Sequence, residues 1–216
     1  ASQNPDGRRI ALRHDIDFSI ESALEISRLE NGLGISSIYF FMLTSNMYNL
    51  LSEKSKSIVE EISSRGHQVS IHFDPTCYGN SFLDGFKTEY TTFKSTFYDL
   101  PPPKLVSIHR PGNFLDDNNQ KLPNVEHTYQ DKYFRKMNYY SDSGGRDIGD
   151  TLSKLEPNTR SANIQILLHP IWWVCRTTSP TETLLKFING NAEMISEETS
   201  KNRKTYDSTK FTGSRQ

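Results

Sequence analysis

The chain has 216 residues, of which 25 are Lys or Arg and 26 are Asp or Glu, giving a formal net charge of −1. This balance, without any basic run, gives no support for a nucleic-acid partner or for binding to an anionic membrane. No apolar stretch approaches the roughly 20 residues of a membrane span, and two cysteines are too few for a disulfide framework, so we expect a cytoplasmic protein without a transmembrane segment.

Strand and helix patterns alternate along the chain. An almost unbroken apolar run at 35–43 is typical of a strand buried on both faces. Aromatic residues three or four apart, from Phe82 to Phe97, predict the buried face of a helix. We expect strands at 9–15, 35–43, 68–72, 101–109, 137–141 and 163–169, and helices after the N-cap Ser19, over 51–65, over 82–97 and from 180 onward.

A final helix is predicted by Ser179, Pro180 and Glu182, which form a capping box. We expect it to bury one apolar face, made of Leu184, Leu185, Ile188, Ala192 and Ile195. No change of composition splits the chain before that point. We therefore predict one domain over 1–196, followed by a polar tail at 197–216 that either extends the helix or is disordered.

The alternation of strands and helices predicts the fold class. Doubly buried strands joined by helices indicate a parallel sheet with right-handed crossovers. Six or seven strands over this length favour a single-domain α/β fold, an irregular (β/α) barrel of about seven parallel strands that is smaller than the eight-stranded kind. Ligands of such folds bind at the carboxyl ends of the strands, so the candidate site lies at that edge of the sheet.

Ionisable side chains stand at several of these strand ends. Each one alone has an ordinary explanation, because an Asp there is usually a cap and a single His usually a buried core residue. Their recurrence in strand after strand, and the alternation that turns them away from the aliphatic face, indicate a shared site. The residues are Asp15, Asp17, His72, His109, Arg110, Asp142 and His169.

Five segments at the strand ends occur in a fixed order. They are LRHDIDFS (12–19), GHQVSIHFD (66–74), IHRPG (108–112), YYSDSGG (139–145) and ILLHP (166–170). Together they resemble the five motifs of the polysaccharide deacetylase family, also called the NodB-homology domain or carbohydrate esterase family 4. The resemblance covers roughly residues 8–175. It implies a hydrolase that removes an N-acetyl group from an amino sugar with a divalent metal, for which zinc is the expected ion.

The resemblance also assigns the acid and base of the reaction. It implies that Asp15 is the catalytic base and takes a proton from the attacking water. Arg110 would pair with Asp15 and keep it ionised. His169, oriented by Asp142, would protonate the leaving amine, which cannot depart as an anion.

The metal ligands are less complete in this sequence than in the family pattern. The resemblance makes Asp17 and His72 two of the ligands. The family usually has a second His four residues after the first, and here that position is Thr76, a poor zinc ligand. Either His109 or Asp74 completes the site, and we favour His109 because strand alternation turns it inward beside His72.

The substrate is the least determined part of the prediction. We expect a substrate site lined by Asp74, Tyr78, Leu167, Trp172 and Trp173. The acyl group is either acetyl or formyl. The resemblance is greatest to a subgroup found with bacterial surface-polysaccharide and O-antigen synthesis, which implies a cytoplasmic or membrane-peripheral enzyme acting on a polymer, a lipid-linked sugar or a nucleotide sugar. The alternative is a non-catalytic carbohydrate-binding relative that lost its metal through Thr76.

Overall fold

The structure is a computed structural model that describes residues 9–112, 121–153, 163–175 and 177–211. It contains two compact units, Ala1–Val174 and Cys175–Gln216, which we describe separately. Every candidate site residue lies in the first unit.

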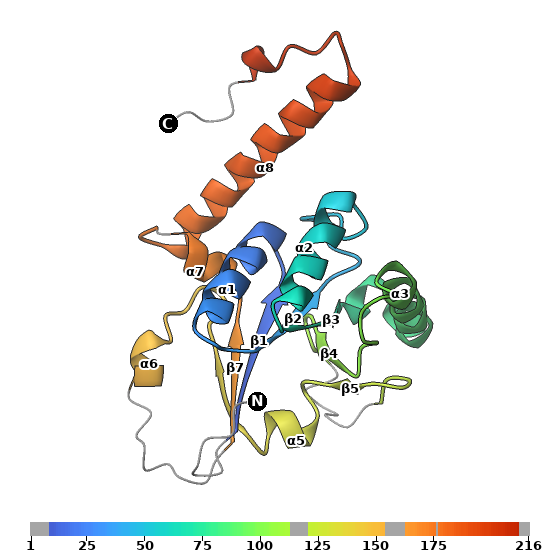
Figure 1. The fold of residues 1–216 in the computed structure, drawn as a ribbon, viewed down its shortest axis with the longest axis vertical. Helices are drawn as coiled ribbons and strands as arrows, with labels where there is room; N and C mark the ends of the chain where they lie inside the picture. Colours follow the sequence, from blue (N-terminus) through green and yellow to red (C-terminus); the bar gives the residue numbers. More distant parts are fainter. Residues whose placement is uncertain (1–8, 113–120, 154–162, 176, 212–216) are drawn as a thin grey trace. The chain divides into compact units, whose positions relative to one another are not determined.

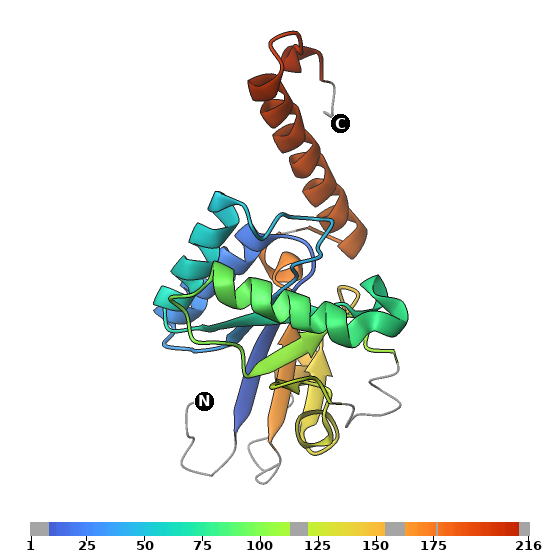
Figure 2. The same ribbon diagram turned by 90° about the vertical axis from the view of Figure 1, so that its right-hand side faces the viewer.

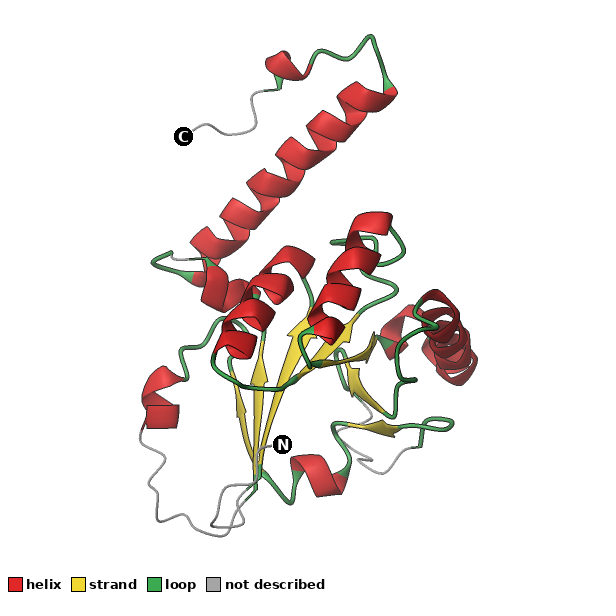
Figure 3. Ribbon diagram, in the orientation of Figure 1, coloured by secondary structure: helices red, strands yellow, loops and turns green. Residues whose placement is uncertain are grey.

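A seven-stranded sheet forms the centre of the first unit. All of its strands pair in parallel, in the order β5-β4-β3-β2-β1-β7-β6. The strand direction turns strongly from β7 towards β5, so the sheet curls into a half-barrel (Figure 3). This confirms the predicted α/β fold with about seven parallel strands. The strands are β1 (Ile10–Ile16), β2 (Ile38–Phe41), β3 (Gln68–Phe73), β4 (Leu105–Ile108), β5 (Glu126–His127), β6 (Asn138–Ser141) and β7 (Ile164–Leu168).

Helices follow the strands and cover the outer side of the sheet, where α1 and α2 lie side by side (Figures 1 and 2). The main ones are α1 (Ile20–Gly32), α2 (Glu53–Ser64) and α3 (Phe82–Thr96). Shorter ones are η1 (Pro75–Cys77), η2 (Gly79–Ser81), α5 (Asp131–Phe134), α6 (Gly149–Ser153) and α7 (Ile171–Val174). Among the helices of the described residues, none is both long enough and apolar enough to cross a bilayer.

The elements start and stop for local reasons. Ser19 caps α1 as predicted, because its side chain accepts a hydrogen bond from the Ser22 amide. The strand expected at 101–109 is reduced to Leu105–Ile108, since the prolines at 101–103 have no N–H to donate to a neighbouring strand.

The two faces of the sheet differ in chemistry. On β3, Val69, Ile71 and Phe73 face the helices and join a core that includes Phe86 and Phe93 of α3. The alternate residues of the strands face the inside of the half-barrel and are buried as well. This confirms the predicted alternation, which turns the polar side chains inward.

A separate buried polar cluster lies on the helix side of β1. Glu30 of α1 lies 2.7 Å from His14 Nε2 and accepts hydrogen bonds from Ser37 Oγ (2.6 Å) and the Tyr39 hydroxyl (2.8 Å). Burial would raise the pKa of Glu30, but the bonds from His14, Ser37 and Tyr39 outweigh it and lower that pKa below its usual value. The cluster ties α1 to β1 and β2.

The second unit consists of α8 (Pro180–Asn202) and the short η3 (Ser208–Lys210). Ser179 caps α8 by accepting a hydrogen bond from the Glu182 amide, as predicted. The predicted buried face is wrong, because Leu185, Ile188 and Ile195 are each more than half exposed. Within this unit the only other described element is η3, which is too small to cover that face. The helix continues past residue 197, and the division of the chain at 196 stays a prediction.

Candidate metal and acid-base site

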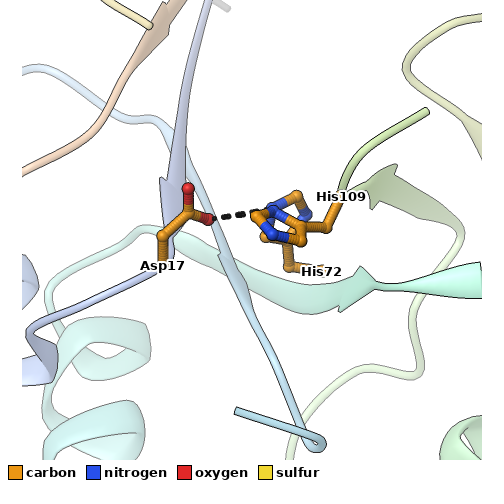
Figure 4. Close-up of side chains that lie close together, drawn as sticks. All are labelled: Asp17, His72 and His109. Atoms are coloured by element: carbon orange, nitrogen blue, oxygen red, sulfur yellow. Dashed lines mark hydrogen bonds and ion pairs between the residues drawn. The ribbon is translucent and has the colours of Figure 1, made fainter. Parts of the chain in front are cut away.

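Three side chains meet at the carboxyl edge of the sheet. Asp17 directly follows β1, His72 lies near the end of β3, and His109 directly follows β4. Asp17 Oδ1 is 3.1 Å from His72 Nε2 and 3.4 Å from His109 Nδ1, and the two imidazole nitrogens are 3.2 Å apart. Figure 4 shows the Asp17 carboxylate facing both rings.

This arrangement fits a divalent metal ion. Zinc binds His nitrogen and carboxylate oxygen at about 2.0–2.1 Å in a tetrahedron, whose ligand atoms are therefore about 3.3 Å apart. The three observed separations lie around this value. Neither imidazole meets Asp17 Oδ1 in hydrogen-bond geometry, and this buried oxygen has no hydrogen bond among the described residues. Asp17, His72 and His109 are thus placed to share one cation.

Opposite charges at this edge stabilise the charged forms of Asp17 and His72. Burial would raise the pKa of Asp17, but His109 and His72 outweigh it and hold that pKa far below its usual value. For His72, burial opposes the charged ring, and the carboxylates of Asp15 and Asp17 nevertheless raise its pKa. The Asp17 carboxylate therefore remains ionised although it is largely buried.

Asp74, the rival third ligand, is engaged elsewhere. Its Oδ1 accepts hydrogen bonds from the backbone N (2.9 Å) and the hydroxyl (2.6 Å) of Thr76. Its Oδ2 lies 3.8 Å from Arg110 Nη1. The structure therefore brings His109, and not Asp74, to Asp17 and His72. Thr76 holds Asp74 through these two hydrogen bonds.

Asp15 lies beside Asp17, His72 and His109. Its ion-pair partner is Arg13, and not Arg110 as predicted from the sequence. Ser107 Oγ donates to Asp15 Oδ2 at 2.7 Å, and Arg13 Nη1 in turn donates to Ser107 Oγ at 2.6 Å and to Thr128 Oγ1 at 2.7 Å. Arg13 Nη1 is also 3.4 Å from Asp15 Oδ2. Arg13 is buried. Burial would lower its pKa, but Asp15 and nearby tyrosines raise that pKa above its usual value.

The predicted pairing of Arg110 with Asp15 is therefore wrong. Arg110 has a positive φ of 48°, its side chain is 69% exposed, and its guanidinium lies near Asp74. The positive φ turns the chain at the end of β4 and carries the side chain away from the half-barrel. A signal for Arg13 was present in the sequence, because residues 13, 15 and 17 share one face of an extended strand.

His169 and Asp142 form the pair predicted for the proton donor. His169 Nδ1 is 2.6 Å from Asp142 Oδ1, and the His169 backbone N donates to Asp142 Oδ2 at 2.9 Å. His169 Nε2 lies 3.7 Å from Asp17 Oδ2, at the border of the Asp17, His72 and His109 set. Burial would lower the pKa of His169, but the bond to Asp142 and the charge of Asp17 raise it above its usual value.

The expected substrate residues are spread over several environments. The Tyr78 hydroxyl donates to Glu89 at 2.9 Å and its ring stacks on Phe73, so this residue is part of the loop packing. Leu167 is buried on the inner face of β7. The half-buried Trp172 contacts Phe18 edge-to-face, and Trp173 is 43% exposed. These rings remain the candidates for contact with a substrate.

Comparison with known proteins gives matches only among solved structures. No protein-family model matches the sequence, and no curated protein does. A mutant of BA3943 from Bacillus anthracis, a CE4 family pseudoenzyme with restored enzymatic activity, is 13% identical with a TM-score of 0.50. That match covers 87% of this chain and 63% of the other, so this chain spans less than two thirds of its length.

A second neighbour is the catalytic domain of peptidoglycan N-acetylglucosamine deacetylase from Eubacterium rectale. It is 13% identical with a TM-score of 0.50, over 86% of this chain and 84% of the other. Identities this low show a shared fold alone. The chain therefore has the fold of the CE4 polysaccharide deacetylases, a NodB-like (β/α) barrel.

Proposed function

We propose that the protein is a metal-dependent hydrolase that removes an N-acetyl or N-formyl group from an amino sugar. The observation that carries this proposal is the convergence of Asp17, His72 and His109 on one point, with Asp15 and His169 on its border. His72 Nε2 is 3.8 Å from Asp15 Oδ2, and Asp17 Oδ2 is 3.7 Å from His169 Nε2. A candidate base and a candidate acid therefore both border the same donor set.

The donor set indicates the kind of ion. One carboxylate oxygen and two imidazole nitrogens suit zinc, and three protein ligands leave a position for water or substrate. A divalent ion held there would polarise the amide carbonyl and make water a better nucleophile.

Asp15 is suited to accept a proton from the attacking water. Ser107 Oγ donates a 2.7 Å hydrogen bond to Oδ2, whereas Oδ1 receives only the long 3.5 Å bond from Arg13 Nη1, so Oδ1 is the less strongly engaged acceptor. The buried guanidinium of Arg13 compensates the carboxylate charge and keeps it available as a base. In this role Asp15 Oδ1 takes one water proton while the hydroxyl oxygen adds to the amide carbon.

His169 is suited to complete the reaction. Its Nδ1 is fixed by Asp142, which leaves Nε2 directed to the metal set. When the carbon–nitrogen bond breaks, Nε2 gives its proton to the amine nitrogen. The products are a carboxylate and a free amino sugar. The acid product loses its proton to solvent, and the proton held by Asp15 returns through solvent to His169 Nε2, which restores both residues to their starting states.

The resemblance of the sequence motifs motivates the proposed substrate. We propose an amino sugar within a surface-polysaccharide or O-antigen precursor in the bacterial cytoplasm. Leu167 would bound the small acyl pocket, because its side chain is buried on the inner face of β7 two residues before His169.

A non-catalytic carbohydrate-binding protein is the alternative. It was motivated by Thr76 at the place of a family ligand. The position of His109 weakens this motive, because Asp17 and His72 have a third donor without residue 76. A protein that only binds sugar also has no use for the Asp15–Ser107–Arg13 triad and the His169–Asp142 pair.

Release of acetate and formate tests the proposal. We would incubate purified protein with N-acyl amino-sugar oligosaccharides after chelation, and again after adding zinc. We expect acyl release with zinc, little release after chelation, and none from an Asp17→Ala variant. Saccharide binding without acyl release at any zinc concentration would contradict the hydrolase and support the alternative.

A further inference from the structure

Trp173 joins the rim of the site to the proton-donor pair. It lies on α7, which follows β7 directly, so the ring and His169 come from one short segment. Its indole Nε1 donates to Asp142 Oδ2 at 2.7 Å, although the residue as a whole is 43% exposed. One edge of the ring is thus fixed on a buried carboxylate while part of its surface faces solvent.

The Asp142 carboxylate is oriented by two aromatic side chains at once. Oδ1 meets the imidazole of His169 at 2.6 Å, and Oδ2 meets the indole of Trp173. The backbone N of His169 contacts both oxygens. Asp142 is completely buried, so no water replaces a lost donor without rearrangement. Removing the indole N–H therefore leaves Oδ2 with the His169 backbone N as its remaining donor, so the carboxylate is held less firmly.

We propose that Trp173 is a positioning residue that couples saccharide binding to the orientation of the proton donor. Its N–H holds Asp142, which holds His169, and its exposed ring offers an apolar face to the C–H face of a sugar. A sugar that packs on the ring therefore contacts the same hydrogen-bonded group, Trp173, Asp142 and His169, that orients His169 Nε2. This inference rests on the proposed function, and it adds a coupling between substrate contact and proton transfer.

Two substitutions separate the functions of the ring and of its N–H. Trp173→Phe keeps an aromatic face and loses the donor, so we expect kcat to fall about tenfold, the effect of one hydrogen bond to a charged acceptor, with KM changed less than about twofold. Trp173→Leu loses both, so we expect the same fall in kcat and a KM raised about tenfold. The control is Tyr133→Phe, which removes a comparable bond to the Glu126 carboxylate (2.6 Å) away from the site and should leave both constants unchanged.

A spectroscopic readout makes the test independent of catalysis. In protein labelled with ¹⁵N-histidine, the Nδ1 signal of His169 reports its bond to Asp142. We expect Trp173→Phe to shift this signal and Tyr133→Phe to leave it in place. Saccharide affinity, measured by titration with glucosamine oligosaccharides, should fall in Trp173→Leu only.

The outcomes separate the positioning role of the Trp173 N–H from the sugar-binding role of its ring. An unchanged His169 signal and an unchanged kcat in Trp173→Phe would overturn the positioning role. Unchanged saccharide affinity in Trp173→Leu would overturn the role of the ring. If the unsubstituted protein hydrolyses no substrate, the proposed function fails, while the His169 signal and the saccharide affinity still decide for or against Trp173.

Discussion

Replacing Arg13 by Met should destabilise the protein strongly, because Arg13 holds a buried carboxylate in place. Arg13→Met keeps the length of the side chain and removes its charge. The lost contacts are the bonds to Ser107 (2.6 Å) and Thr128 (2.7 Å) and the ion pair with Asp15 (3.4 Å). All of these groups are buried. Breaking a buried pair from one side costs about 3–5 kcal/mol, since the remaining charge is left uncompensated.

The free energy of unfolding in urea measures this effect. Arg110→Met is the matched control, since Arg110 is largely exposed and its Nη1 lies 3.8 Å from the carboxylate of Asp74. Exposed pairs contribute about 0–1 kcal/mol, so the control should unfold almost like the unsubstituted protein. A larger loss in Arg110→Met than in Arg13→Met would refute the assignment of Arg13 to Asp15.

A double variant tests the mechanism behind the loss. Asp15→Asn removes the charge that Arg13→Met leaves unpaired. The two substitutions together should therefore cost less than the sum of their separate costs, by about 1–3 kcal/mol. Strictly additive costs would show that Arg13 acts through packing and not through the charge of Asp15.

Three further predictions concern the metal, the chemistry and the pH dependence of stability. His109→Ala should weaken zinc binding by at least about 100-fold, since even residues that only contact a ligand contribute about 10–100-fold. Asp74→Ala should change zinc affinity little in the same titration. The reverse order of the two effects would exclude His109 as a ligand. Asp15→Asn and His169→Ala should each slow acyl release about 100-fold or more with the fold intact by circular dichroism, and a rate near that of the unsubstituted protein in either would contradict its role. Glu30→Gln should lower the free energy of unfolding at pH 7 by about 2–4 kcal/mol. The folded-state pKa of Glu30 lies below its unfolded value, so its contribution is complete above about pH 4.5 and is lost as the pH falls through the folded-state pKa; a difference between the two proteins that stays constant down to about pH 2 would contradict this.

Periodicity accounts for what the sequence predicted correctly. Alternation along β1 and β3 fixes which residues face the inside of the half-barrel, and parallel pairing brings the strand ends to one edge. Alternation thus placed the polar residues at one edge and favoured His109, while the resemblance to the family motifs selected Asp17 and His72 among them as ligands. The resemblance paired His169 with Asp142, and in the structure the neighbouring strands β6 and β7 bring the two residues together.

The errors arose where a backbone turn or a missing neighbour decides the outcome. The resemblance to the family paired Arg110 with Asp15, but alternation with Ser107 and His109 turns residue 110 to the opposite side, and its positive φ ends the regular strand there. Arg13 has the correct parity, yet alternation alone does not say which of two cations reaches Asp15. The apolar residues of α8 have helical spacing, but burial requires a surface to pack against, and spacing alone does not supply one.

The most direct test of the central claim is the position of a metal ion in the protein. Crystals grown with saturating zinc would be measured at the zinc absorption edge. The account predicts one anomalous peak about 2.0–2.2 Å from Asp17 Oδ1, His72 Nε2 and His109 Nδ1. Absence of a peak at these three atoms, with zinc absent or bound only elsewhere, would contradict the proposed metal-dependent hydrolase.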